Sequence, residues 1–292
     1  MRALYDLPAP AKLNLFLHVT RKRADGYHLL QSVFVLIDWQ DTLHIERSND
    51  GRLHRHDLGT HLPADDLCLR AARALQQASG TPLGADIHID KHIPWGAGLG
   101  GGSSDAATVL LALNRLWELH WPRQRLLQLA ATLGADVPFF ILGRPAWVEG
   151  IGEQLTPLPP SAALPTHYAV VKPPQALPTA AVFASPHLLM SEKPAIVADF
   201  LAAPRGYGRN DLQEAAKALS SDVTQALELL SGTFGNSRMT GSGSAVFAWT
   251  SDVRHSAWTA ALPQGWTGRL CQALPAHPLV GWASDPENRG AG

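Results

Sequence analysis

One short stretch of this chain combines the residue types and the spacing that bind phosphate. Five of the seven residues from 96 to 102 are glycine, so the stretch lacks bulky side chains and is free to adopt positive φ angles. Ser103, Ser104 and Asp105 follow with helix-capping chemistry, and residues 106–117, rich in Ala and Leu, are expected to continue as a helix. A glycine loop before a helix presents unpaired backbone N–H groups and the positive end of the helix dipole, and both attract phosphate. A flexible linker is the alternative, but linkers do not lead directly into an apolar helix.

The class of phosphate loop follows by elimination. The spacing of Gly96, Gly98 and Gly101 fits the G-x-G-x-x-G pattern of dinucleotide-binding folds. Such a fold also needs a second strand ending in an acidic residue about 20 residues beyond the loop. Glu118 lies near that distance, but it ends a helix before Pro122 and has no strand before it. No Lys-Ser or Lys-Thr follows the glycines, and the H-R-D and D-F-G motifs of protein kinases are absent from the sequence. The loop therefore needs a cation from elsewhere in the chain.

A lysine and an asparagine in residues 10–15 are candidates for chemistry. The strand period places Lys12 and Asn14 on the face opposite Leu13 and Leu15, which predicts a half-buried strand. The alternative for Lys12 is an ordinary solvated lysine.

Asp136 lies between a helix end and the apolar residues 137–140. A carboxylate in such surroundings needs a cation or backbone donors as partners. It would equally well cap a short helix that has Pro138 in its first turn. The residues alone leave both interpretations open.

Residues 240–247 form a second glycine-serine loop that leads into a strand. Its small residues would allow close packing against the phosphates of a ligand. A hairpin turn is an equally good interpretation of the segment.

Together with residues 23–28, these segments resemble the GHMP kinase superfamily of ATP-dependent small-molecule kinases. They are most similar to the branch that phosphorylates a sugar alcohol carrying cytidine diphosphate, in non-mevalonate isoprenoid precursor biosynthesis. The motifs that carry the resemblance lie in the expected order over most of the chain, at residues 10–17, 23–28, 98–104, 133–139 and 240–243. The first motif and the A-D-G-Y-H segment are much more specific than the glycine loop. Outside Pro178, Thr179, residues 210–212 and the late loop, the second half matches more weakly.

The resemblance implies catalytic and ATP-binding roles. Lys12 and Asp136 would be the catalytic pair, with Lys12 supplying the missing cation and Asp136 accepting the proton of the attacking hydroxyl. ATP is expected to bind along Pro94, Trp95, Gly96, Ala97, Gly98, Leu99, Gly100, Gly101, Gly102, Ser103 and Ser104. Trp95 departs from the family pattern at the adenine end of this loop. Mg²⁺ would bridge the β- and γ-phosphates, and no residue identifies itself as a metal ligand.

The resemblance also implies contacts with a small-molecule substrate. These would come from Asn14, Tyr27, His28, Lys91, Asp136, Thr179 and Phe183. The cytosine ring would stack between Tyr27 and Phe183.

The order of the elements predicts an α+β fold with antiparallel pairing, because the strands come early and close together. The resemblance adds an N-terminal domain like the second domain of ribosomal protein S5 and a ferredoxin-like C-terminal domain. We expect these at residues 1–156 and 157–283, with a flexible tail at 284–292. Strands are predicted within residues 13–19, 33–37, 85–90, 168–171 and 245–249, and helices over residues 65–78, 106–117, 123–133, 211–218 and 222–230. The helix at 123–133 is expected to end at Gly134 in the left-handed conformation.

Composition excludes several classes of protein. A net charge of −1 over 292 residues argues against a nucleic-acid or membrane-surface binder. Cys68 and Cys271 lie far apart, without the spacing of a zinc site or a disulfide framework. His54 and His56 fit one face of an exposed strand better than a metal site. With no signal peptide and no apolar run of about 18 residues, we expect a cytoplasmic protein. The oligomeric state stays open.

Two alternatives to a kinase of the cytidine-diphosphate branch remain. One is another superfamily member, such as a mevalonate- or homoserine-type kinase or an ATP-dependent decarboxylase. Tyr27 and His28 argue against it, because none of those substrates carries a cytidine. The other is a non-catalytic binding protein of the same fold. The presence of both Lys12 and Asp136 argues against it, because a binding protein has no use for a base.

Overall fold

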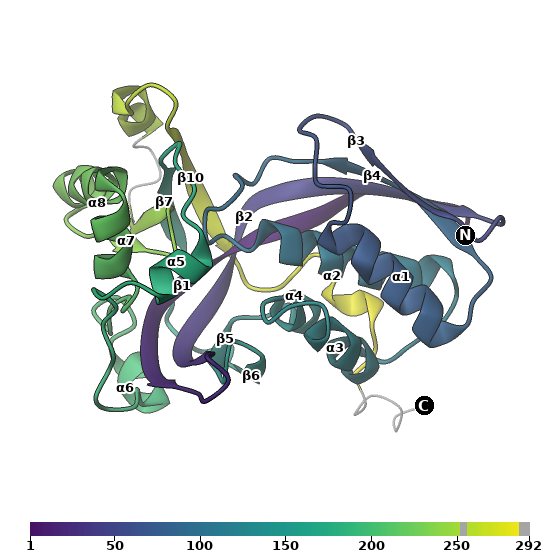
Figure 1. Ribbon diagram of the computed structural model, residues 1–292, viewed down its shortest axis with the longest axis horizontal. Helices are drawn as coiled ribbons and strands as arrows, with labels where there is room; N and C mark the ends of the chain where they lie inside the picture. Colours follow the sequence, from purple (N-terminus) through teal and green to yellow (C-terminus); the bar gives the residue numbers. More distant parts are fainter. Residues whose placement is uncertain (252–255, 286–292) are drawn as a thin grey trace.

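Two long antiparallel strands organise the computed structural model, which describes residues 1–251 and 256–285 (Figure 1). They are β1 (Ala3–Lys22) and β2 (His28–Ser48), joined at the turn predicted near Gly26. The prediction that β1 is half-buried is wrong, because residues 9–17 of this strand are all buried. Both faces of this stretch are covered, so the side chains of Lys12 and Asn14 are buried within the protein.

The other strands extend this pair into one sheet. The order is β3-β4-β2-β10-β7-β9-β8, with β1 and β5 also pairing with β2 and β6 pairing with β5. The predicted antiparallel pairing is confirmed throughout except between β3 and β4, which run parallel. The bounds are β3 (Leu53–Asp57), β4 (Gly84–Asp90), β5 (Ala146–Glu149), β6 (Gln154–Pro157), β7 (His167–Lys172), β8 (Arg238–Met239), β9 (Val246–Trp249) and β10 (Thr267–Leu274).

The helices form two groups, one packed on the β2 and β4 side and the other beside β7 and β9 (Figure 1). One group is α1 (Leu67–Ser79), α2 (Gly101–Leu116), α3 (Arg123–Ala131) and α4 (Val137–Leu142), which share a core with β2 and β4. The other group includes α7 (Gln213–Leu219) and α8 (Ser221–Phe234), which pack on β7 and β9. The short helices α5 (Thr179–Phe183) and α6 (Val197–Ala202) follow the proline-rich crossing, and 3₁₀ turns occupy Ser256–Ala261 and Val280–Trp282. No helix in the described ranges is long and apolar enough to cross a membrane.

Two predictions about helix ends are wrong. Helix α2 begins at Gly101 after Gly100, whose φ of 72° places the N-cap in the left-handed region. Ser104 and Asp105 therefore lie inside the helix, where the Ser104 hydroxyl donates to the Pro10 carbonyl (2.7 Å) instead of capping. Helix α3 ends earlier than expected, at Ala131, and Gly134 is not left-handed.

The C-terminal segment returns to the N-terminal helices. The guanidinium of Arg123 donates to the carbonyls of Ile141, Val280 and Ala283. Ser284 and Asp285, the first two residues of the predicted tail, also contact Arg123, and residues 286–292 lie outside the described part. Strand β10 pairs with β2, so one sheet runs through both halves, and the domain boundary at 156/157 stays a prediction.

Candidate active site

A cavity of about 740 Å³ opens where β1, the glycine loop, α4, α5 and the β8–β9 turn meet. Its size is typical of a small-molecule site. Most of the residues predicted for catalysis and substrate binding line it: Lys12, Asn14, Tyr27, His28, Asp136, Thr179 and Phe183. Gly96, Gly98 and Gly100 line it from the predicted ATP loop.

The backbone of the glycine loop requires glycine at alternate positions. Gly96, Gly98 and Gly100 all have φ between 61° and 73°. A Cβ at Gly98 would lie 2.4 Å from the Thr240 carbonyl oxygen, and one at Gly100 would lie 2.9 Å from the Phe140 ring. The loop is therefore packed too closely for side chains, and it leads directly into α2, whose first N–H groups have no helical acceptors.

The other residues predicted to bind ATP have different surroundings. Ala97 and Leu99 are buried behind the loop, where the Leu99 carbonyl accepts from the Lys12 amide (2.9 Å). Ser104 is buried as well, and its hydroxyl is occupied by Pro10. Gly101, Gly102 and Ser103 form the first turn of α2. Pro94 precedes the loop, and the side chain of Trp95 is 66% exposed.

Lys12 is buried and aimed at a carboxylate. Only 3% of it is exposed, and its Nζ lies 3.6 Å from Oδ2 of Asp136. The same ammonium donates to Oδ1 of Asn14 (2.6 Å) and lies over the ring of Phe34. The interpretation of Lys12 as a solvated lysine is wrong. Burial lowers the pKa of Lys12, and the charge of Asp136 only partly opposes that shift.

Asp136 stands immediately before α4, with Pro138 in the first turn as predicted. Its side chain makes no capping hydrogen bond, although its backbone carbonyl accepts from Phe139. One third of the side chain is exposed, on the cavity. Of the two interpretations of Asp136, the structure supports the carboxylate paired with a cation.

The second glycine-serine loop is both a turn and a wall of the cavity. It joins β8 to β9, which pair antiparallel, so the hairpin interpretation is confirmed. Its far end packs on the glycine loop, where the Ala245 amide donates to the Ala97 carbonyl (3.1 Å). Ser242 bonds to the Thr179 hydroxyl (2.8 Å) and so links the turn to α5. Contact between this loop and phosphates stays a prediction.

Aromatic residues form part of the cavity wall. The rings of His28 and Phe183 stack at a centroid distance of 5.0 Å and an angle of 22°. Tyr27 also borders the cavity and is 60% exposed. Burial and the nearby charge of Lys22 lower the pKa of His28. The stacking of cytosine between Tyr27 and Phe183 remains a prediction.

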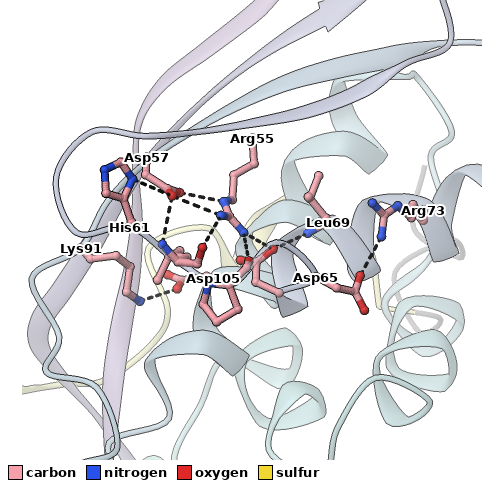
Figure 2. A network of polar contacts seen from close by, with 11 residues as sticks. Arg55, Asp57, His61, Asp65, Leu69, Arg73, Lys91 and Asp105 are labelled. Atoms are coloured by element: carbon pink, nitrogen blue, oxygen red, sulfur yellow. Dashed lines mark hydrogen bonds and ion pairs between the residues drawn. The ribbon is translucent and has the colours of Figure 1, made fainter.

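Lys91 does not line this cavity. Its Nζ is held by Asp41 and by Asp105, as Figure 2 shows for Asp105. Asp41 also accepts from the amides of His92 and Ile93. Burial alone would lower the pKa of Lys91, but the two carboxylates outweigh it and raise the pKa.

A second ionic network fixes the connection from β3 to α1 (Figure 2). Arg55 bonds to Asp57 (2.7 Å) and Asp66 (2.9 Å) and donates to the Leu62 carbonyl. Asp66 also caps α1 through the Leu69 amide. His54 and His56 lie on the exposed face of β3, as predicted, and the structure adds that both contact Asp86. No cluster of possible metal ligands occurs among the described residues.

From the sequence, neither Ser32 nor Phe34 was singled out, and Thr240 was given no individual role. Ser32 and Thr240 are buried and bond to Asn14. A polar side chain inside an apolar strand was the available signal for Ser32.

Two family models match the chain. The model for the GHMP kinases N terminal domain matches residues 66–144, and the model for the GHMP kinases C terminal matches residues 198–263.

Several similar proteins carry the name 4-diphosphocytidyl-2-C-methyl-D-erythritol kinase. The one from Methylibium petroleiphilum is 61% identical over 287 residues, covering 97% of this chain and 99% of the relative. The one from Paracidovorax citrulli is 55% identical, covering 98% of this chain and 100% of the relative.

Two solved structures are also similar. The crystal structure of a 4-(cytidine 5'-diphospho)-2C-methyl-D-erythritol kinase has a TM-score of 0.79 at 35% identity, covering 92% of this chain and 98% of that one. A homoserine kinase from Cytophaga hutchinsonii shares the fold, with a TM-score of 0.69 at 15% identity and coverage of 95% and 96%.

Proposed function

Because this chain belongs to the 4-diphosphocytidyl-2-C-methyl-D-erythritol kinases of the GHMP kinase family, we propose how its cavity performs that reaction. The enzyme transfers a phosphoryl group from ATP to its substrate in non-mevalonate isoprenoid precursor biosynthesis. The predicted family and α+β two-domain fold are confirmed by the same matches. We assign the acceptor to the 2-hydroxyl of the methylerythritol, which gives the 2-phosphate and ADP.

The phosphates of ATP are proposed to bind between the glycine loop and α2. The left-handed glycines keep side chains out of this space, and the first turn of α2 directs its N–H groups and dipole toward an anion. The exposed Trp95 stands at the start of the loop, on the adenine side.

The ion pair of Lys12 and Asp136 is the observation that carries the catalytic proposal. A buried ammonium at the loop supplies the positive charge that the transferred phosphoryl group needs. Asp136, one third exposed on the cavity, accepts the hydroxyl proton as the new P–O bond forms and the bond to ADP breaks. A non-catalytic binding protein has no need of such a pair.

Magnesium fits this arrangement as a companion of ATP. The ion takes most of its ligands from phosphates and water and needs only one or two carboxylates. Those ligands would be phosphate oxygens and water, while Asp136, which pairs with Lys12 on the cavity wall, is proposed as the base and not as a metal ligand. When bound, the ion neutralises charge on the β- and γ-phosphates.

The cytidine end of the substrate is proposed to bind near His28 and Phe183. Their stacked rings already form an aromatic surface beside the exposed Tyr27. Thr179 and Asn14 complete the wall toward the phosphoryl site. Lys91, which the resemblance assigns to the substrate, is occupied by two carboxylates, and we assign it instead to support of the glycine loop.

The proposal is tested by ADP release with ATP, Mg²⁺ and a panel of alcohols. The panel contains 4-diphosphocytidyl-2-C-methyl-D-erythritol, methylerythritol phosphate, mevalonate and homoserine. We expect rapid turnover with the first compound and at least about a hundredfold lower kcat/KM with the others, because only it fills both ends of the cavity. Equal turnover of mevalonate or homoserine would contradict the substrate assignment.

A further inference from the structure

A buried network behind Lys12 connects three parts of the chain that are distant in sequence. Asn14 on β1, Ser32 on β2 and Thr240 at the start of the β8–β9 turn are each at most 1% exposed. Their hydrogen bonds to one another lie between 3.0 and 3.2 Å. Because the group is shielded from water, each donor must find an acceptor within the protein.

The single hydrogen of the Ser32 hydroxyl fixes one end of the network. Ser32 donates that hydrogen to the Phe16 carbonyl, which lies where the pairing of β1 and β2 changes register. Toward Asn14, Ser32 is therefore able only to accept. It accepts from Nδ2 (3.1 Å), which turns the oxygen of the amide away from Ser32.

Thr240 fixes the other end. Its oxygen accepts from the Asn14 backbone N–H (3.0 Å), and its hydroxyl hydrogen goes to Oδ1 of Asn14 (3.2 Å). That amide oxygen therefore has one stable orientation, in which it also accepts from Nζ of Lys12 (2.6 Å).

We propose that Thr240 and Ser32 are positioning residues for catalysis. They hold the Asn14 amide with its oxygen toward Lys12, and so aim the ammonium at Asp136 and the phosphoryl group. The inference rests on the proposed function of Lys12. It also makes the C-terminal half of the chain part of the catalytic geometry, because Thr240 lies 226 residues from Asn14.

The network should also affect the pKa of Lys12. Asp136 is the charged side chain that pairs with Lys12, at the start of α4. The other elements around the Lys12 side chain present the Phe34 ring from β2, the loop residue Gly100 beside Cγ, and the uncharged network. Burial already lowers the pKa of Lys12, so loss of a fixed acceptor would lower it further.

Thr240→Val is the direct test, because valine keeps the shape and removes the hydroxyl. We expect kcat to fall about 10- to 100-fold with little change in the KM for ATP, since the ammonium is displaced rather than lost. The alkaline limb of the kcat profile should move to lower pH, because Lys12 is active when protonated. Thr240→Ser keeps the hydroxyl and should restore both values.

Thr108→Val is the matched control for a structural effect. Thr108 is also fully buried, and its hydroxyl donates to the Pro8 carbonyl (3.2 Å), away from the cavity lining. We expect it to lower the melting temperature about as much as Thr240→Val does, without moving kcat or its alkaline limb. If Thr240→Val fails to fold, Ser32→Ala provides the same test, because it frees the other end of the amide.

An NMR titration separates this inference from the proposed function. The Cε resonance of Lys12, assigned by its loss in Lys12→Met, reports the lysine pKa whether or not the protein phosphorylates the substrate. A lower pKa in Thr240→Val, with recovery in Thr240→Ser, supports the positioning role. A wild-type kcat in Thr240→Val, or a reduced kcat with an unshifted Lys12 titration, would overturn it.

Discussion

A buried lysine, Lys12, and a largely buried one, Lys91, flank consecutive glycines, and their surroundings differ in charge. A Cβ at Gly100 would lie 3.1 Å from Cγ of Lys12, and one at Gly101 would lie 3.4 Å from Nζ of Lys91. Lys12 faces one partly exposed carboxylate, whereas Lys91 lies between two buried ones. Burial lowers the pKa of Lys12, while for Lys91 the two carboxylates outweigh burial and raise it.

The difference shows how the number of carboxylates decides the role of a buried cation. The ammonium of Lys12 is only partly compensated, so it can stabilise a further negative charge such as a transferring phosphoryl group. Lys91 is saturated by Asp41 and Asp105 and has no charge to spare for a ligand. We therefore expect changes at the first lysine to affect chemistry and changes at the second to affect stability.

The largest effect on kcat is expected from replacing Lys12 or its partner Asp136. Lys12→Ala and Asp136→Asn should each lower kcat by at least about a thousandfold, because each removes one member of a single unit. The double variant should lose little more than either single one. Steady-state kinetics would measure this, and circular dichroism would check that the fold is intact. A near wild-type kcat in either single variant would exclude the pair from catalysis.

Replacing Lys91 should instead lower the stability of the folded protein. Lys91→Met leaves two buried carboxylates without a cation, which should lower the free energy of unfolding by about 3–5 kcal/mol. Burial raises the pKa of Asp105 well above its usual value, although the charge of Lys91 opposes this shift, so the carboxyl takes up a proton readily as the pH falls. The deficit in urea unfolding should therefore be smaller at pH 5 than at pH 8. A deficit that does not change with pH would argue against uncompensated carboxylates as its cause.

The loop between the two lysines provides a third test. In Gly101→Val the new Cβ would lie 3.0 Å from Ile93 and close to Lys91, on the turn proposed to bind phosphate. We expect ATP affinity to fall about 10- to 100-fold by calorimetry. Gly232→Ala is the control, since a Cβ there has open space within α8. Unchanged ATP affinity in Gly101→Val would place the phosphates elsewhere.

The aromatic residues of the cavity belong neither to the Lys12–Asp136 pair nor to the Lys91 network, so changing them should affect only substrate binding. Tyr27→Ala should raise the KM for the cytidine substrate about 10- to 100-fold, as stacking of a base contributes about 1–3 kcal/mol. Because Tyr27 is largely exposed, the melting temperature of the variant should hardly change. The KM for ATP should not change either. A destabilised variant with an unchanged substrate KM would remove Tyr27 from the cytidine site.

The elements with strong local signals could be predicted from the sequence. The glycine loop, α1, α3 and β4 were placed within a few residues, because glycine content and apolar period are local properties. The start of α2 was misplaced because Gly100 takes the left-handed N-cap, so the helix begins before the serines that usually cap one.

The polar contacts that distinguish the two lysines could not be predicted in this way. Asp41 reaches His92 across 51 positions and Thr240 reaches Asn14 across 226, and no periodicity connects such distant residues. The pairing of Lys12 with Asp136 came from the resemblance to a family. The structure added the burial that makes this pair different from a surface ion pair.

The most direct test of the two roles is kcat for Lys12→Met and Lys91→Met, measured side by side with ATP, Mg²⁺ and 4-diphosphocytidyl-2-C-methyl-D-erythritol. The temperature is chosen so that both variants are folded. We predict that Lys12→Met loses at least about a thousandfold in kcat, whereas Lys91→Met stays within about tenfold of the wild type and keeps its substrate KM. An equal loss of kcat in both, or a substrate KM raised by Lys91→Met, would contradict the division of roles between the two lysines.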